Sequence, residues 1–313
     1  EEALSEQLPY VVITVPAYFD DERRRATISA GEIAGFKEVL SLVNEPTAAA
    51  IAFGLQHTGE DETVLVYDLG GGTFDVTLLR VEEQGKSIKI IATDGDHQLG
   101  GKDFDDGIIR KCISVFMEEH GFDPTTDPCE MQQLRKDAEK AKKELTLRNR
   151  TVVMVRAKGK RSRVTITREG FDQIIKPKID TTFSLIRTCL RGAKMAPEDV
   201  NRILLIGGST RIPLVRDEIK RFFGKVPDTS VNPDEAVSLG AAIMAAKKYS
   251  ELSPEDVAET IKDVIAPIQI TDVVSHSLGI EAMSMDGKVF NAILIKRNSP
   301  IPTEISKEFT TTI

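Results

Sequence analysis

Three consecutive glycines, Gly70 to Gly72, interrupt the segment VYDLGGGTFDVTLL between two runs that alternate apolar and polar residues. Glycine costs about 0.5–1 kcal/mol in a strand interior relative to alanine. Three glycines in a hairpin are therefore expected only where another group approaches the backbone closely, or where the turn needs backbone angles that other residues disfavour. The N–H groups of such a turn can form an anion-binding concavity. An ordinary bulged hairpin would account for the same residues.

The composition and charge of the chain narrow its class. Its 313 residues give room for two domains, and a net charge of −8 argues against a nucleic-acid or membrane partner. The one strongly basic run, residues 156–163, is expected to be a solvated hairpin tip. No apolar run reaches the roughly 18 residues of a membrane span. Three separated cysteines and four histidines without ligand spacing favour a reducing, cytoplasmic compartment and give no sign of a structural metal.

Two segments share a pattern that predicts helices in contact. NEPTAAAIAFG and NPDEAVSLGAAIMAA each begin with an asparagine suited to a helix cap, Asn44 or Asn232, followed by an early proline. Gly54 is expected to end the first helix. Bodies rich in alanine and glycine would let two backbones touch where the helices cross. Alanine is also simply a good helix former, so the pattern leaves both interpretations open.

A second glycine turn and a charged helix add candidate binding groups. Gly207 and Gly208 in LLIGGSTRIP join an expected strand to an expected helix, and Arg211 could stack on a flat ring near their backbone. On the expected helix 130–147, four polar side chains share one face; they are Glu139, Lys142, Lys143 and Thr146. That face could hold a ribose and a base, or it could be a solvated helix surface.

The remaining pattern predicts a hairpin over residues 151–168 and a helix over 169–192. After Tyr249 the composition changes to a spacer and then to β structure punctuated by turns. We therefore expect a domain boundary near residue 267.

Seven segments together resemble one family. TVPAYFDDERRRAT, NEPTAAAIAFG, VYDLGGGTFDVTLL, LGGKDFD, EKAKKELT, LLIGGSTRIP and VNPDEAVSLGAA occur in the order seen in DnaK-type heat-shock chaperones, the 70-kDa heat-shock protein family. The match covers nearly the whole chain. It implies an α/β fold, the actin-like two-lobed ATPase with ribonuclease H-like lobes, of which the first is incomplete here. The end of the chain resembles the start of the family's all-β sandwich, which binds peptides.

The resemblance also implies a division of the chain. The expected parts are 1–57 for the remainder of the first lobe, 58–231 for the second lobe with 101–174 as its outer subdomain, 232–250 for a crossing helix of the first lobe, 251–272 for a spacer and interdomain linker, and 273–313 for the start of the substrate-binding sandwich.

The family's functional residues carry over to matching positions. The catalytic residues implied are Asp68, Glu45 and Thr73, with Asp68 also holding Mg²⁺ through water. The nucleotide-binding residues implied are Gly70, Gly71, Gly72, Thr73, Gly100, Gly101, Glu139, Lys142, Lys143, Thr146, Gly207, Gly208, Ser209, Arg211 and Asp234. Pro16 and Arg24 match a pair that relays the nucleotide state.

The function implied is that of an ATP-dependent chaperone, in which ATP hydrolysis in the cleft between the lobes is coupled to binding of unfolded polypeptide. ATP or ADP and Mg²⁺ are the implied cofactors, and a J-domain co-chaperone and a nucleotide exchange factor are the implied partners. Two alternatives remain. One is an actin-like scaffold or nucleotide sensor that folds no clients, and the other is a sugar or metabolite kinase on the same fold.

Three departures from the family pattern bear on activity. The family's first phosphate-binding hairpin, of the type DLGTT, and a lysine that assists transfer would precede Glu1, so we expect a fragment with impaired hydrolysis. Lys102 stands where the family usually has a ribose-binding glutamate. Gln269 and Thr271 interrupt the normally apolar linker, which is expected to weaken its docking.

Overall fold

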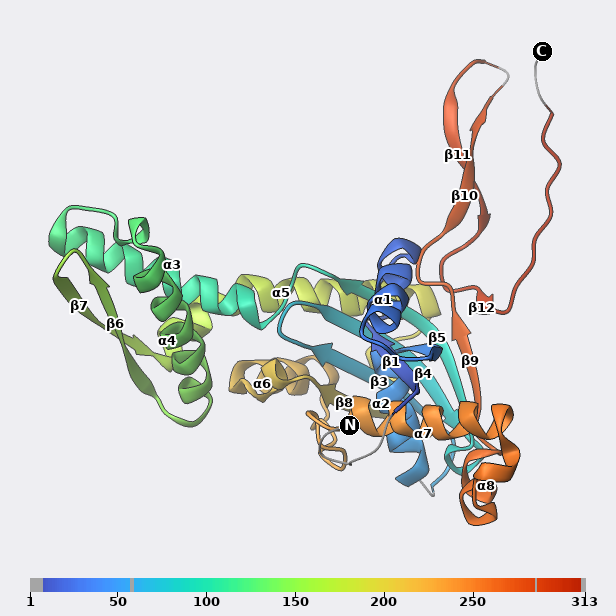
Figure 1. Ribbon diagram of the computed structural model, residues 1–313. Coiled ribbons are helices and arrows are strands. Elements are labelled where there is room, and N and C mark those ends of the chain that lie inside the picture. Colours follow the sequence, from blue (N-terminus) through green and yellow to red (C-terminus); the bar gives the residue numbers. More distant parts are fainter. Residues whose placement is uncertain (1–7, 57–58, 285, 311–313) are drawn as a thin grey trace.

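The computed structural model describes residues 8–56, 59–284 and 286–310 of a mixed α/β protein (Figure 1). Its strands are β1 (Tyr10–Val15), β2 (Glu38–Asn44), β3 (Glu62–Leu69), β4 (Phe74–Glu82), β5 (Ser87–Asp96), β6 (Arg150–Ala157), β7 (Lys160–Thr167), β8 (Arg202–Ile206), β9 (Gln269–Val273), β10 (Leu278–Met283), β11 (Val289–Ile295) and β12 (Pro300–Ile301). Its α-helices are α1 (Asp21–Ile33), α2 (Glu45–Gln56), α3 (Gly101–His120), α4 (Pro128–Leu147), α5 (Arg168–Ala193), α6 (Pro213–Phe223), α7 (Ala236–Leu252) and α8 (Glu259–Ile265).

A sheet with the strand order β12-β9-β5-β4-β3-β8 forms the centre of the molecule. The glycine turn joins β3 and β4 as an antiparallel hairpin, and β8 lies parallel to β3. Helices cover both faces of β3. The Tyr67 hydroxyl shares a hydrogen bond with Thr182 of α5 (2.9 Å), whereas Val64 and Val66 pack in the cluster that contains α2. Because both faces are buried, the strand reads as a continuous apolar run.

Helices α2 and α7 touch backbone to backbone beside this sheet. A Cβ atom on Gly240 of α7 would lie 1.8 Å from the carbonyl oxygen of Ala48 in α2, so only glycine permits the approach. Ala48, Ala49 and Ala50 are fully buried. Of the two interpretations that the sequence left open, the structure has the close crossing of these helices.

Two details predicted for α2 are wrong. The side chain of Asn44 does not cap the helix, because it accepts a hydrogen bond from Arg24 Nη2 (2.7 Å) and donates one to Asp272 Oδ2 (2.9 Å). Gly54 does not end the helix, which continues to Gln56. A Cβ on Gly54 would lie 2.9 Å from the carbonyl oxygen of Gly85, so this glycine serves packing inside the helix.

The start of α7 also differs from the prediction. The helix begins at Ala236, so Asn232 and Pro233 lie in a turn that precedes it. The Asn232 side chain accepts a hydrogen bond from the backbone N–H of Asp234 (3.1 Å). Its backbone oxygen accepts one from Ala236 (2.9 Å), and this bond links the turn to the helix. The asparagine therefore caps a turn, and the proline stands outside the first helical turn.

Helices α3 and α4 and the β6–β7 hairpin form a unit that projects from the sheet, at the left of Figure 1. The hairpin predicted over 151–168 is confirmed, and Lys158 and Gly159 at its tip have positive φ angles of 46° and 73°. Helix α5 runs from this unit to the central sheet. Over the described ranges, no helix combines the length and the apolar character needed to cross a membrane.

The segment after α8 joins the central sheet as β9, which lies between β5 and the two-residue strand β12. β9 pairs with β5 in parallel from Gln269 to Thr271, and β12 pairs with β9. Ile268 and Val273 are buried, whereas Gln269 and Thr271 are exposed. The two polar residues therefore alternate to the solvent side of the strand, and they do not oppose its docking as the sequence suggested.

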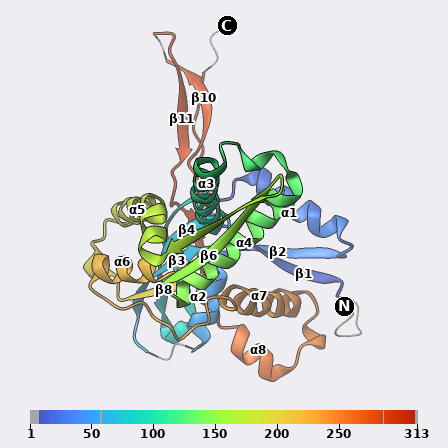
Figure 2. The same ribbon diagram turned by 90° about the vertical axis from the view of Figure 1, so that its left-hand side faces the viewer.

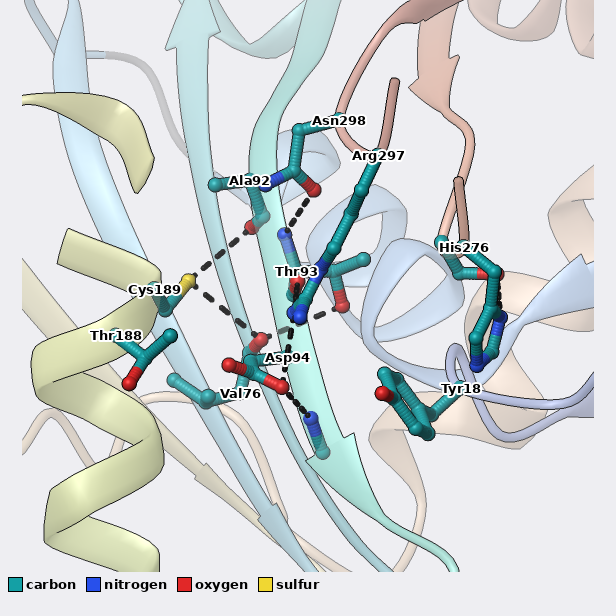
Figure 3. A network of polar contacts seen from close by, with 12 residues as sticks. Tyr18, Val76, Ala92, Thr93, Asp94, Thr188, Cys189, His276, Arg297 and Asn298 are labelled. Carbon is teal, nitrogen blue, oxygen red and sulfur yellow. Dashed lines mark hydrogen bonds and ion pairs between the residues drawn. The ribbon is translucent and has the colours of Figure 1, made fainter. Parts of the chain in front are cut away.

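Arg297, which follows β11, ties the end of the chain to β5 (Figure 3). Its Nη2 atom lies 2.8 Å from a carboxylate oxygen of Asp94 and donates to the carbonyl oxygen of Thr93. Its guanidinium carbon lies 5.6 Å from the centre of the Tyr18 ring. Beside it, the Asn298 side chain accepts a hydrogen bond from the Thr93 N–H (3.1 Å). Arg297 and Asn298 thus provide hydrogen-bond partners for the backbone C=O and N–H of Thr93 in β5, beyond the residues of β5 that pair with β9.

Replacing Arg297 with alanine should loosen this attachment. The change leaves the buried Asp94 carboxylate without its ion pair, at a cost of about 2 kcal/mol. Hydrogen exchange at the amides of Thr93, Val274 and Asn298 should quicken by more than tenfold. Lys296→Ala, a change at the exposed neighbouring position, is the control. Equal exchange rates in both variants would show that Arg297 does not hold this segment against β5.

Candidate active site

Three loops converge at the glycine turn between β3 and β4. The Gly70 carbonyl oxygen accepts hydrogen bonds from the N–H of Gly101 at the start of α3 (3.0 Å) and from Ser209 Oγ after β8 (2.9 Å). Gly100 approaches so closely that a Cβ there would lie 2.6 Å from the nitrogen of Gly72. Residues far apart in the sequence are thus assembled around one turn.

The turn leaves backbone donors free. The Gly70 N–H closes the turn on the Thr73 carbonyl oxygen (3.0 Å). In the described part of the chain, the N–H groups of Gly71, Gly72 and Thr73 have no hydrogen-bond partner, and Gly71 and Gly72 are exposed. Three successive free N–H groups can bind an anion such as a phosphate.

Buried carboxyl groups lie beside this turn. Asp68 and Asp75 face each other across the β3–β4 hairpin and are 6% and 1% exposed. Burial, together with the charges of Glu45 and Asp75, raises the pKa of Asp68 well above its ordinary value. Burial also raises the pKa of Asp75 to about 7, although the Tyr18 N–H that donates to it (3.0 Å) acts in the opposite direction. Glu45 has a pKa raised by burial.

Asp75 is absent from the predicted site residues, because its place opposite Asp68 follows from the register of the hairpin. Leu69 pairs with Phe74 across the four-residue turn, so the acids immediately outside this pair, Asp68 and Asp75, must face each other. Two acids placed symmetrically about a glycine turn are unfavourable without a cation or a proton to offset their repulsion.

A pocket of about 540 Å³ lies next to the turn, between α4 and the segment after β8. It is lined by Gly71, Glu139, Lys142, Lys143, Thr146, Leu147, Gly208, Ser209, Arg211, Ile212 and Asp234. Ion pairs join Lys143 to Glu139 (2.6 Å) and Arg211 to Asp234 (2.5 Å). The pairing raises the pKa of Lys143 and lowers that of Glu139. The helix face and the second glycine turn identified in the sequence therefore border one cavity.

Lys142 has a structural contact that the sequence did not reveal. Its Nζ atom donates to the Gly101 carbonyl oxygen and to Asp105, each at 2.9 Å, and so joins α4 to the start of α3. Lys102 is exposed, and its backbone N–H donates to the Gly71 oxygen (2.8 Å).

Pro16 and Arg24 lie away from the pocket. Arg24 donates to the carbonyl oxygens of Ala17 (3.2 Å) and Phe19 (3.0 Å). Burial lowers the pKa of Arg24. Asn44 accepts a hydrogen bond from Arg24 and donates one to Asp272 in β9, and so connects these two residues. Arg24 is thus linked to β9 through Asn44 and Asp272, a connection that the sequence analysis did not predict.

Comparison with known proteins agrees with this architecture. A family model described as Hsp70 protein matches residues 1–313. The chain is 44% identical over 317 residues to the chaperone protein DnaK of Thermosipho melanesiensis, and 44% identical over 317 residues to that of Thermosipho africanus. Each match covers 99% of this chain and 50% of the relative, so the chain spans about half the length of these curated relatives. The predicted α/β, actin-like fold class is confirmed, and the chain belongs to the Hsp70 family.

Proposed function

We propose that the chain binds ATP or ADP, with Mg²⁺, between the glycine turn and the pocket beside α4. The observation that carries this proposal is the position of Gly71, which belongs to the turn and also lines the pocket. A ligand that fills the pocket would therefore extend an anionic end toward the free N–H groups. A nucleoside diphosphate or triphosphate combines a flat base, a sugar and such an anionic end.

Each group would act according to its chemistry. Glu139, Lys143 and Thr146 offer polar groups to a ribose and a base, and Arg211 offers a guanidinium that can stack on the base. Bound ATP supplies the phosphoanhydride bond, and Mg²⁺ neutralises its phosphates. Asp68 would orient the attacking water through hydrogen bonding, with Glu45 as the second carboxylate and the Thr73 hydroxyl near the terminal phosphate.

The buried carboxyl groups fit a divalent cation. Asp68, Asp75 and Glu45 repel one another, and a cation nearby would offset that repulsion. No group of three or more acids, histidines or cysteines in the described ranges is arranged to chelate a metal ion. These carboxylates would therefore hold Mg²⁺ through its water shell.

We propose further that the protein works as an ATP-dependent chaperone in the cytoplasm. Its family supports this, and so do the exposed apolar residues Ile280, Phe290 and Ile293 of the β10–β11 hairpin, which suit binding of unfolded polypeptide. A J-domain co-chaperone, a nucleotide exchange factor and the domain division given above belong to the same proposal. An actin-like scaffold or sensor would bind ATP without any response to unfolded polypeptide.

Arg211→Ala tests the nucleotide site. Loss of the guanidinium should weaken binding of Mg-ATP and Mg-ADP by about tenfold, because stacking of a cation on a desolvated ring contributes about 1–2 kcal/mol. Isothermal titration calorimetry measures the change. Arg191→Ala, at an exposed position of α5 outside the pocket, should bind both nucleotides as the unmodified chain does. If the Arg211 variant bound nucleotide with unchanged affinity, Arg211 would not contact the base, and this side of the pocket would not be part of the nucleotide site.

A further inference from the structure

The outward face of the β6–β7 hairpin is strongly basic. Alternate residues of the two strands are buried against α3 and α4, and the others point to solvent. We define the cationic face by its exposed basic residues on the outward side of the hairpin: Arg148, Arg150, Arg156, Arg161 and Arg163. From Leu145 to Arg168 the sequence contains no acid, although the whole chain carries a net charge of −8. Figure 2 views the hairpin from its outer side, where no other element lies in front of it.

The arrangement of these charges costs stability. Arg156 lies directly opposite Arg161 in the ladder, and like charges in directly opposed positions repel each other. Acids at any of these exposed positions would relieve the repulsion without disturbing the core. The face therefore has the charge pattern of a surface whose positive charges are neutralised by a bound partner.

A groove at the base of the hairpin offers a place for carboxylates. It has a volume of about 450 Å³ and is lined by Glu144, Arg148, Arg150, Thr151, Val152, Arg163 and Thr165. Within the described residues, none of its three guanidinium groups forms an ion pair. Its single acid, Glu144, accepts a hydrogen bond from the Thr151 hydroxyl (2.5 Å) and lies 3.9 Å from Lys140. Guanidinium groups bind carboxylates in a bidentate manner.

Apolar side chains lie among the cations. Val152 is 39% exposed, and Met154, which pairs with Arg163 across the ladder, is half-buried. Every second side chain of an extended peptide points to the same side, so only those positions can contact this face. If acids and apolar residues alternate among those positions, the acids could reach the arginines while the apolar residues cover Val152 and Met154.

We propose that the cationic face binds an acidic, extended segment of a partner protein in which every second residue faces the hairpin and acidic and apolar residues alternate among those positions. A nucleic acid fits less well, because the face presents no aromatic side chain on which bases could stack, and the net charge of the chain repels a long polyanion. The proposal does not rest on the nucleotide site, because none of the residues of the cationic face lines that pocket.

The test uses a fluorescein-labelled ten-residue peptide in which glutamate and valine alternate at every second position, with serine between them, and anisotropy is the readout at low salt. The intact chain should bind it saturably, and binding should weaken as salt is raised. Arg150→Gln with Arg163→Gln should weaken binding at least tenfold. Lys136→Gln with Lys220→Gln removes the same charge from exposed positions elsewhere and should change binding less than twofold. Circular dichroism checks that both variants remain folded.

Three results would overturn the proposal. One is the absence of saturable binding of the alternating peptide, and another is an equal loss in both double variants, which would indicate bulk charge alone. The third is tighter binding of a ten-nucleotide oligothymidine than of the peptide, with the same sensitivity to Arg150 and Arg163, which would make the face a nucleic-acid surface.

Discussion

Gly240→Ala is expected to lower the free energy of unfolding by more than about 3 kcal/mol. The added Cβ would lie 1.8 Å from the carbonyl oxygen and 2.4 Å from the carbonyl carbon of Ala48. These are backbone atoms, which cannot rotate away, so α2 and α7 would have to separate. Helix propensity alone predicts the opposite sign, because alanine is favoured over glycine by about 1 kcal/mol in a helix interior. Urea denaturation followed by circular dichroism therefore distinguishes the two effects by sign.

Gly192→Ala provides the matched control for this change. Gly192 is exposed near the end of α5, and a Cβ there would meet only the end of the Asn298 side chain, at 3.4 Å. This variant should be neutral or slightly more stable than the unmodified chain. If Gly240→Ala were as mild, the two helices would not be in backbone contact.

Asp75→Asn should remove a large pH dependence of stability. The pKa of Asp75 is raised from 3.8 to about 7 in the folded chain. The folded state therefore holds this proton more tightly than the unfolded state does. The corresponding stability is fully present below about pH 4 and is lost as the pH rises through 7, a change of about 4 kcal/mol. Relative to the asparagine variant, the unmodified chain should become less stable over this range.

The measurement is urea denaturation of both proteins at several pH values between 4 and 8. The groups that face Asp75 are Glu45, Arg24 and Asp94, together with Asp68 across the hairpin, and the variant keeps all of them. Asp217→Asn, at an exposed position of α6, controls for the loss of one acid. If the cluster holds Mg²⁺, adding MgCl₂ should reduce the loss near neutral pH. Parallel stability curves for Asp75→Asn and the unmodified chain would contradict the raised pKa.

The sequence predicts those parts of the fold that depend on interactions between neighbouring residues. The glycine triplet predicts the β3–β4 hairpin, and two strand-like runs joined through Gly159 predict β6–β7, because strand patterns and turn chemistry are contained in a few neighbouring residues. Small residues permit the crossing of α2 and α7, but they do not by themselves predict it, because these two helices are far apart in the sequence.

What the sequence could not reveal depends on contacts between distant residues. The side chain of Asn44 forms hydrogen bonds with Arg24 and with Asp272, which is 228 positions away. It therefore does not cap α2, although the local sequence favours a cap. Asp75 becomes a site residue only once the register of the hairpin is known. Gln269 and Thr271 interrupt a linear apolar pattern, but their effect depends on which side of β9 faces solvent.

The shallow attachment of β9 has a consequence for solubility. Only three residues of β5, Ser87 to Lys89, pair with β9, so release of this strand would uncover an open sheet edge. Unpaired N–H and C=O groups on such an edge recruit any extended chain, including a second copy of this one. Lys89 is exposed at the end of that stretch and forms an ion pair with Glu82 (2.5 Å), and charged side chains at a sheet edge discourage pairing with another strand. A charged side chain at this position would thus limit aggregation wherever β9 is released from β5.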